Sequence, residues 1–258
     1  MIFYLSGTGN SKWAAQKIAQ LTQETLYAIS EFTTGDCNFA LKADERIGFV
    51  FPVHGWRPPK IMRTFMQKLQ LHAENLEQHF CYLLCTAGND IGMTMVYAQK
   101  DLEKAGLHVH AMFSLLMPNT YVGLPFMDVD HEGVSQQKKQ EATQDLQHYA
   151  QAIFDCKHGE VHLHLSKWPR INSYVLGGFF TKFLITDKRF HVNTQRCVKC
   201  GICSAVCPVD NIDGGFRKQP IWKHNQKCLT CFTCYHHCPK HAIGYGWATH
   251  RKGQYFFK

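Results

Sequence analysis

The sequence has no run of hydrophobic residues long enough to cross a membrane. A transmembrane helix needs about 18 consecutive apolar residues, whereas the nearest candidate, residues 174–186, is shorter and contains Lys182 and two glycines. The first ten residues, MIFYLSGTGN, also lack the basic and then apolar pattern of a secretory leader. We therefore expect a soluble cytoplasmic protein with reduced thiols, in which clustered cysteines bind metal or take part in catalysis rather than form disulfides.

Acidic residues are scarce in the second part of the chain. Residues 156–258 hold 16 Lys and Arg against 4 Asp and Glu, whereas residues 1–155 hold 12 against 16, and the whole chain has a net charge of +8. A length of 258 residues suits one large or two ordinary domains. Because the charge is so uneven, we expect two domains, 1–155 and 191–258, joined by a packed connector at 156–190.

Several common cofactor motifs are also missing. The chain has neither the GxGxxG string of dinucleotide-binding loops nor a loop ending in Lys-Ser or Lys-Thr, which argues against nicotinamide dinucleotides and ATP. It lacks the C-x3-C-x2-C spacing of radical enzymes and the C-x-x-C-H string of c-type haem proteins. We therefore do not expect a radical enzyme or a c-type haem protein.

The first half alternates short apolar runs with helical patterns. The runs 2–5, 47–53, 80–84 and 108–116 are expected strands, and amphipathic helices follow them, the last at 134–154. Nearly unbroken apolar strands between helices predict an α/β fold with a doubly wound parallel sheet. In such a sheet the ligand lies beyond the carboxyl ends of the strands, here at loops 6–11, 52–57, 85–92 and 117–123.

The loop at residues 6–11, Ser-Gly-Thr-Gly-Asn-Ser, is typical of a phosphate site. Its hydroxyls and the free amides at the start of the following helix can surround an anion. The alternative is a Ser- and Gly-rich turn with a capping serine. Four cysteines of this half and the connector, Cys37, Cys81, Cys85 and Cys156, have no partner at metal spacing and are expected to be buried apolar residues.

The remaining eight cysteines form two copies of the motif C-x2-C-x2-C-x3-C-P, at 197–208 and 228–239. In this motif three cysteines hold one [4Fe–4S] cluster and the fourth ligates the other cluster. We therefore assign cluster one to Cys197, Cys200, Cys203 and Cys238, and cluster two to Cys228, Cys231, Cys234 and Cys207. Ile212 and Ile243, at equivalent places after each motif, are expected against the clusters. The alternative is zinc, which does not explain a third cysteine at the same spacing. His236 and His237 are expected to be surface groups or neighbours of the ligands.

A strand leading into SGTGNS resembles the FMN phosphate loop of flavodoxins. Together with FPVHGWRPPKI at 51–61 and CLTCFTCYHHCPKHAIGYG at 228–246, it makes the chain similar to the flavodoxin/ferredoxin fusion proteins often called the EFR1 family. The resemblance implies a flavodoxin-like domain followed by a small α+β bacterial ferredoxin-like domain, with FMN and two [4Fe–4S] clusters as cofactors. The implied FMN contacts are Ser6, Gly7, Thr8, Gly9, Asn10, Ser11, Pro52, Val53, His54, Gly55, Trp56, Thr86, Ala87, Gly88 and Asn89.

These parts predict an iron–sulfur flavoprotein that moves electrons between an external acidic redox protein, of ferredoxin or flavodoxin type, the clusters and FMN. One hypothesis is reduction of a small organic acceptor at the flavin, with His54, Trp56 and Tyr121 as candidate catalytic residues. The other is a carrier that serves a partner enzyme and has no substrate of its own. An open pocket above the flavin would favour the first, and a covered ring edge the second. Loss of FMN and nucleic-acid binding by the basic half remain weaker alternatives. Oxygen-labile clusters suggest an anaerobic or microaerophilic cell.

Overall fold

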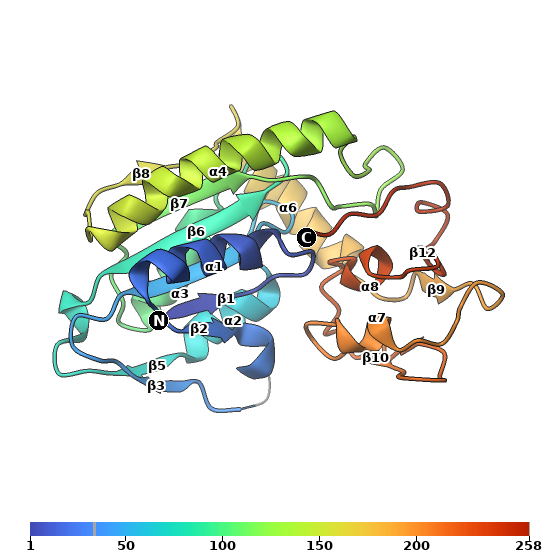
Figure 1. The fold of residues 1–258 in the computed structure, drawn as a ribbon, viewed down its shortest axis with the longest axis horizontal. Helices are drawn as coiled ribbons and strands as arrows, with labels where there is room; N and C mark the ends of the chain where they lie inside the picture. Colours follow the sequence, from blue (N-terminus) through green and yellow to red (C-terminus); the bar gives the residue numbers. More distant parts are fainter. Residues whose placement is uncertain (33–34, 258) are drawn as a thin grey trace.

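The computed structural model describes residues 1–32 and 35–257 and shows two lobes joined by a helix (Figure 1). The larger lobe is built on a six-stranded parallel sheet in the order β2-β1-β4-β6-β7-β8. Its strands are β1 (Ile2–Tyr4), β2 (Leu26–Ala28), β4 (Ile47–Pro52), β6 (Cys81–Ala87), β7 (Ala111–Leu116) and β8 (Val161–His162). The predicted doubly wound parallel sheet is therefore confirmed.

Helices cover both faces of this sheet. On one face α1 (Asn10–Thr22) packs beside α4 (Glu132–Phe154), and on the other α2 (Lys60–Lys68) packs beside α3 (Thr94–Lys104). The central strands β4 and β6 are buried almost throughout because both of their faces are covered. Cys81 and Cys85 point to the same face of β6 and join its apolar core, as the alternation of a strand predicts.

Short elements complete the large lobe. The strands β3 (Asn38–Ala40) and β5 (Gln70–His72) form a separate parallel pair, and η1 (Ile29–Phe32) and η2 (Leu76–Gln78) are single helical turns. The strand β8 pairs with β7 beyond residue 155. The sheet therefore continues past the expected end of the first domain, since the chain returns from α4 to add one more strand.

A helix from Pro169 to Leu184 leads from the sheet to the small lobe. It runs through α5 (Pro169–Ile171), η3 (Asn172–Leu176), α6 (Gly177–Phe179) and η4 (Phe180–Leu184). One face packs on the large lobe through Ser173 and Gly177, which are buried. The opposite face exposes Ile171, Tyr174, Val175, Leu176, Phe179 and Phe183. The connector therefore packs against the first domain on one side only.

The small lobe is built from two similar halves. The strand β9 (Phe190–Val192) pairs antiparallel with β12 (Ile243–Tyr245), and β10 (Ile212–Asp213) pairs antiparallel with β11 (Ile221–Trp222). The short helices α7 (Ile202–Ala205) and α8 (Thr233–His236) follow the second cysteine of each motif. No helix of the described residues is long and apolar enough to cross a membrane.

Candidate functional site

The small lobe contains two cysteine-lined cavities. The first cavity is lined by Cys197, Cys200, Cys203 and Cys238. The second cavity is lined by Cys207, Cys228, Cys231 and Cys234. The structure thus brings together the same two groups of four cysteines that the motif assigns to cluster one and cluster two. Ile243 lines the first cavity and Ile212 the second.

The backbone around the two cavities repeats residue for residue. Equivalent positions of the two motifs take the left-handed conformation, in the pairs Lys199 and Thr230, Gly201 and Phe232, and Asp210 and His241. Four residues after the last cysteine of each motif, a backbone amide donates to that cysteine's Sγ, from Asn211 to Cys207 at 3.3 Å and from Ala242 to Cys238 at 3.2 Å. Amide donors aimed at sulfur suit metal-bound thiolates. The residues present therefore fit iron–sulfur clusters.

Burial favours the neutral form of Cys228 and Cys234 in the second cavity when no cation is near. Desolvation, with a smaller effect from Cys231, raises the pKa of Cys228 to about 12. Desolvation also raises the pKa of Cys234 well above its ordinary value. A bound metal centre would supply the positive charge that crowded thiolates need.

The two cavities differ in their surroundings. The first is near the surface, since Cys200 is exposed and the exposed Lys199, Lys218 and Lys240 line its rim. The second faces the large lobe: Val209 and Leu229 on its wall belong to the apolar core of the sheet, against which Cys207 and Cys231 pack.

The loop at residues 6–11 connects β1 to α1 and has the chemistry of an anion site. The Oγ of Ser6 accepts a hydrogen bond from the Gly9 amide at 3.1 Å, and the Ser11 and Thr86 hydroxyls are 2.8 Å apart. The amides of Asn10, Ser11 and Lys12 have no acceptor among the described residues, because they form the first turn of α1. This loop therefore fits the phosphate of a mononucleotide.

The side chain of Asn10 serves packing instead. Its Nδ2 donates to the Pro118 carbonyl at 3.2 Å, and its Oδ1 accepts from the Tyr255 hydroxyl at 2.8 Å. The anion site therefore consists of backbone amides and hydroxyls, while Asn10 ties the C-terminal segment to the loop.

The small lobe lies directly on this loop. A Cβ added to Gly7 would collide with Thr233 Oγ1 and would lie 3.8 Å from Cys231 Cβ. A Cβ on Gly9 would lie 2.8 Å from Phe257 Cβ, and the Phe257 amide donates to the Thr8 carbonyl at 2.7 Å. The phosphate loop and the second cysteine cavity are therefore adjacent.

The segment 52–57 forms a tight turn beside the loop. Gly55 and Trp56 both have positive φ, at 56° and 58°, and His54 and Arg57 exchange two backbone hydrogen bonds across them. The Trp56 indole donates to Asp90 Oδ2 at 3.0 Å, so it is anchored to loop 85–92. Pro52 and Val53, like the turn, are half-buried.

The imidazole of His54 is available to a ligand. It has no hydrogen-bond partner within the described part of the chain, and burial lowers its pKa to about 4, so the ring is neutral at neutral pH. The residue as a whole is half-buried. A neutral imidazole in this place can donate or accept one hydrogen bond.

The third loop contributes mainly backbone. Thr86 and Ala87 are buried, Gly88 lies against the Asn119 side chain, and the Gly88 carbonyl accepts from Lys138 Nζ at 2.8 Å. Asn89 is exposed.

Phe180 of the connector covers the space between these loops. A Cβ on Gly55 would lie 2.5 Å from the Phe180 ring, and the Phe180 and Tyr121 ring centroids are 5.3 Å apart, edge to face. Tyr121 also meets Phe232 of the small lobe at 5.4 Å. The connector therefore covers the 52–57 turn, one of the loops expected to border the flavin.

His236 is a structural residue that the motif alone did not indicate. It is 1% exposed, its Nε2 lies 2.8 Å from the Thr120 carbonyl, and its Nδ1 accepts from the Tyr255 amide at 3.2 Å. Since one nitrogen must donate and the other accept, the ring is neutral and carries its proton on Nε2. His236 therefore joins the small lobe, loop 117–123 and the C-terminal segment.

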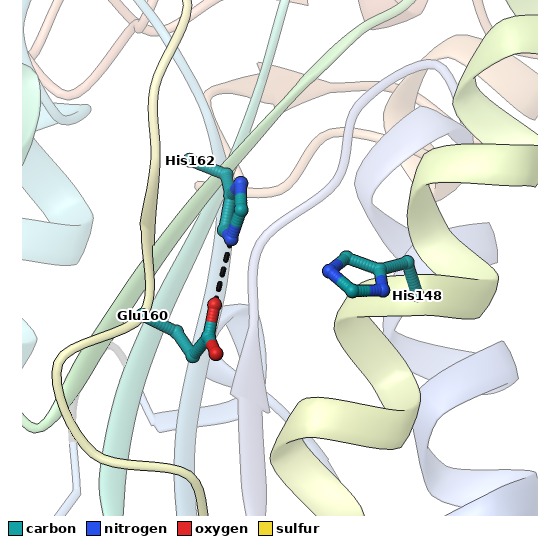
Figure 2. Close-up of side chains that lie close together, drawn as sticks. All are labelled: His148, Glu160 and His162. Carbon is teal, nitrogen blue, oxygen red and sulfur yellow. Dashed lines mark hydrogen bonds and ion pairs between the residues drawn. The ribbon is translucent and has the colours of Figure 1, made fainter.

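A separate group of potential metal-ligating side chains lies on the large lobe. His148, Glu160 and His162 place one ligand atom each within 4.8 Å of one another (Figure 2). His148 lies in the C-terminal half of α4, His162 lies in β8, and Glu160 directly precedes β8. The sequence did not single out any of the three.

Family models match both lobes. Residues 1–128 match a flavodoxin domain, and residues 189–239 match a 4Fe-4S dicluster domain. The flavodoxin domain implies FMN, and the dicluster domain implies iron–sulfur clusters. The chain is thus an iron–sulfur flavoprotein of the electron-transfer class. It belongs to the flavodoxin/ferredoxin fusion proteins.

Solved structures with similar folds include the flavodoxin of Streptococcus pneumonia TIGR4, with 11% identity and a TM-score of 0.30 over 57% of this chain and 97% of that one. An azoreductase from Bacillus anthracis str. Sterne has 10% identity and a TM-score of 0.35 over 60% of this chain and 98% of that one. A search of curated proteins finds no match. Identities and scores this low say nothing about the reaction of this chain.

Proposed function

We propose that this protein carries electrons between an external redox protein and FMN through two [4Fe–4S] clusters in series. Cluster one would be held by Cys197, Cys200, Cys203 and Cys238, and cluster two by Cys207, Cys228, Cys231 and Cys234. The contact of Gly7 with Thr233 and Cys231 carries this proposal, because it makes the candidate phosphate loop a neighbour of cluster two.

The roles of the chain's own residues follow from this arrangement. Clusters exchange single electrons, and FMN exchanges one or two. The amides of Asn10, Ser11 and Lys12 and the hydroxyls of Ser6, Thr8 and Ser11 would hold the phosphate. The 52–57 turn and the backbone at Thr86, Ala87 and Gly88 would border the ring, and Phe180 and Tyr121 would keep water and small molecules from its edge.

A covered ring favours a carrier over a reductase. Phe180 lies against Gly55 and contacts Tyr121, so the connector covers the turn that is expected to border the ring. Reduction of a small organic acceptor is the second candidate, favoured by the His54 imidazole, which has no partner among the described residues. That reaction would require the connector to move away from the turn.

The external partner would dock where cluster one approaches the surface. Cys200 and Val198 are exposed there, and Lys199, Lys218 and Lys240 surround them. An apolar centre with a basic rim complements a small acidic redox protein of ferredoxin or flavodoxin type.

Charge reversal tests this docking site. Under anaerobic conditions, a chemically reduced acidic ferredoxin would be mixed with wild type and with the variant Lys199→Glu, Lys218→Glu, Lys240→Glu. We expect the second-order rate of electron transfer to fall about tenfold or more at low salt, with a weaker dependence on ionic strength.

The matched control reverses Lys17, Lys100 and Lys104, which are exposed on the large lobe. It has the same net charge change at a distance from cluster one. Equal rates for the two triple variants would show that the docking site lies elsewhere.

A further inference from the structure

The cluster of His148, Glu160 and His162 lies apart from the cofactor loops, where α4 meets the edge strand β8. Figure 2 shows the His148 ring directed from α4 toward the Glu160 and His162 pair. His162 Nε2 and Glu160 Oε2 are 2.7 Å apart, and their side chains are 39% and 30% exposed. The hydrogen bond to His162 lowers the pKa of Glu160, so the carboxylate is ionised.

Aromatic packing fixes the orientation of the His162 ring. The ring lies nearly parallel to Phe113, at 6° with centroids 6.0 Å apart, and contacts Tyr149 at 5.3 Å. His148 approaches edge to face, with centroids 5.6 Å apart. One ligand is therefore held by packing, while the exposed His148 is free to move toward it.

We propose that these three side chains bind a zinc-type divalent transition metal. Two imidazole nitrogens and one carboxylate oxygen are a zinc donor set, and a water molecule would complete the tetrahedron on the solvent side. Ligand atoms about 2.1 Å from a common tetrahedral centre lie roughly 3.4 Å apart. The observed spread of up to 4.8 Å therefore requires His148 to approach by roughly 1 Å and the Glu160–His162 pair to separate slightly.

Such a metal would clip β8 to α4. The strand β8 has only two residues and is the edge of the sheet, and the chain continues from it through His164, whose amide donates to Ser114 Oγ, into the connector. Metal binding would thus stabilise the attachment of the connector to the large lobe.

Calorimetric titration of Zn²⁺ into anaerobically purified holoprotein tests the site, with iron content and absorbance followed to show that the cysteines keep their clusters. We expect one site of micromolar or tighter affinity, weakened at least tenfold in His148→Ala and in His162→Ala. Zinc should also slow hydrogen exchange at residues 161–164 in the wild type.

The matched control is His158→Ala, which removes a nearby histidine outside the cluster and should bind zinc as the wild type does. Absence of a zinc site in wild type would overturn the proposal, and so would a site that persists in the His148→Ala, His162→Ala double variant.

The exposed face of the connector carries a second, independent inference. Ile171, Val175, Phe179 and Phe183 recur at helical spacing along it and are 50–62% exposed, with Trp168 at its start 67% exposed. Lys167, Arg170 and Lys182 are exposed on the same segment, and residues 161–186 contain no acidic residue. A convex aromatic and aliphatic ridge bordered by cations is typical of helices that lie in the interface of an anionic membrane.

We infer that this ridge binds the surface of an anionic lipid bilayer. The apolar side chains would enter the headgroup region, and the flanking cations would pair with lipid phosphates and carboxylates. Sedimentation of the holoprotein with phosphatidylcholine vesicles containing phosphatidylserine should recover most of the protein, and vesicles of phosphatidylcholine alone should recover much less.

In the double variant Val175→Glu, Phe179→Glu, the affinity for the phosphatidylserine-containing vesicles should fall at least tenfold. Phe126→Glu, Phe216→Glu changes two exposed side chains elsewhere, 83% and 76% exposed, and should retain it. Failure of the wild type to sediment, or a dimer in solution that the connector variant dissociates, would overturn the inference, the latter by showing that a second copy covers the ridge.

Discussion

Gly7 is a residue at which the two halves of the chain lie in direct contact. Its hydrogen faces Thr233 Oγ1 and the Cβ of Cys231, so any side chain there would push the small lobe off the phosphate loop. The loop therefore needs glycine at this position for contact with the small lobe as well as for phosphate binding.

Gly7→Ala is therefore expected to lower FMN content and the thermal unfolding temperature together. Overpacking of this kind costs typically 1–3 kcal/mol. Thr233→Ala removes the colliding atom and should restore part of both quantities in the double variant. Flavin absorbance per chain and differential scanning calorimetry under anaerobic conditions measure the two effects.

Gly133→Ala serves as the control, because a Cβ there meets no atom within 4 Å and the residue lies in α4. It should be neutral or slightly stabilising. An equal loss of FMN in Gly7→Ala with and without Thr233→Ala would contradict the proposed collision.

His54 gives the candidate flavin site a pH dependence. Burial lowers its folded-state pKa to about 4, whereas an unfolded histidine titrates near 6.5. The unfolded chain therefore binds more protons between these values, and stability falls as the pH drops from about 6.5 toward 4.

Between pH 7.5 and 5.5 this effect amounts to about 1 kcal/mol. Thermal unfolding at the two pH values should show a smaller loss of stability in His54→Gln than in wild type. His131→Gln, at an exposed position, should behave as wild type. If His54→Gln loses as much stability between the two pH values as the wild type does, His54 does not cause the pH dependence.

At the scale of elements, we expect the connector helix to control whether small molecules reach the flavin. Phe180 faces inward onto Gly55, and its neighbour Phe179 faces solvent at 57% exposure. Comparing variants of Phe180 and Phe179 therefore distinguishes loss of the cover over the flavin ring from the general effect of removing an aromatic side chain.

We expect Phe180→Ala to raise the rate at which a small dye oxidises the reduced protein by several-fold, because the ring edge becomes accessible. Phe179→Ala should leave this rate unchanged. Anaerobic stopped-flow absorbance gives both rates. Equal rates in Phe180→Ala and wild type would show that Phe180 does not shield the flavin.

The long elements could be predicted from sequence, and the short ones could not. Continuous apolar runs indicated β4, β6 and β7, and helical periodicity indicated α4. The three-residue strands β2, β3 and β5 are too short to show a period, and their pairing partners lie far away in the chain. The expected boundary at 155 fell before β8, because two residues are enough to add an edge strand.

For the whole molecule, the grouping of the eight cysteines followed from spacing, but the contact between the lobes did not. Thr233, Phe180 and Phe257 approach the flavin loops through tertiary packing, which no local motif encodes. The aromatic C-terminal residues Tyr255, Phe256 and Phe257 were a signal in the sequence for that packing.

The central claim is that electrons reach FMN through cluster one and then cluster two. The direct measurement is anaerobic stopped-flow reduction of the flavin by a reduced acidic ferredoxin in Cys200→Ser, which removes a cluster-one ligand, with Cys156→Ser as the matched control. Iron analysis should show about eight iron atoms in the control and fewer in Cys200→Ser. We predict flavin reduction at least tenfold slower in Cys200→Ser and unchanged in Cys156→Ser; a wild-type rate in a Cys200→Ser protein shown to have lost cluster one would contradict the account.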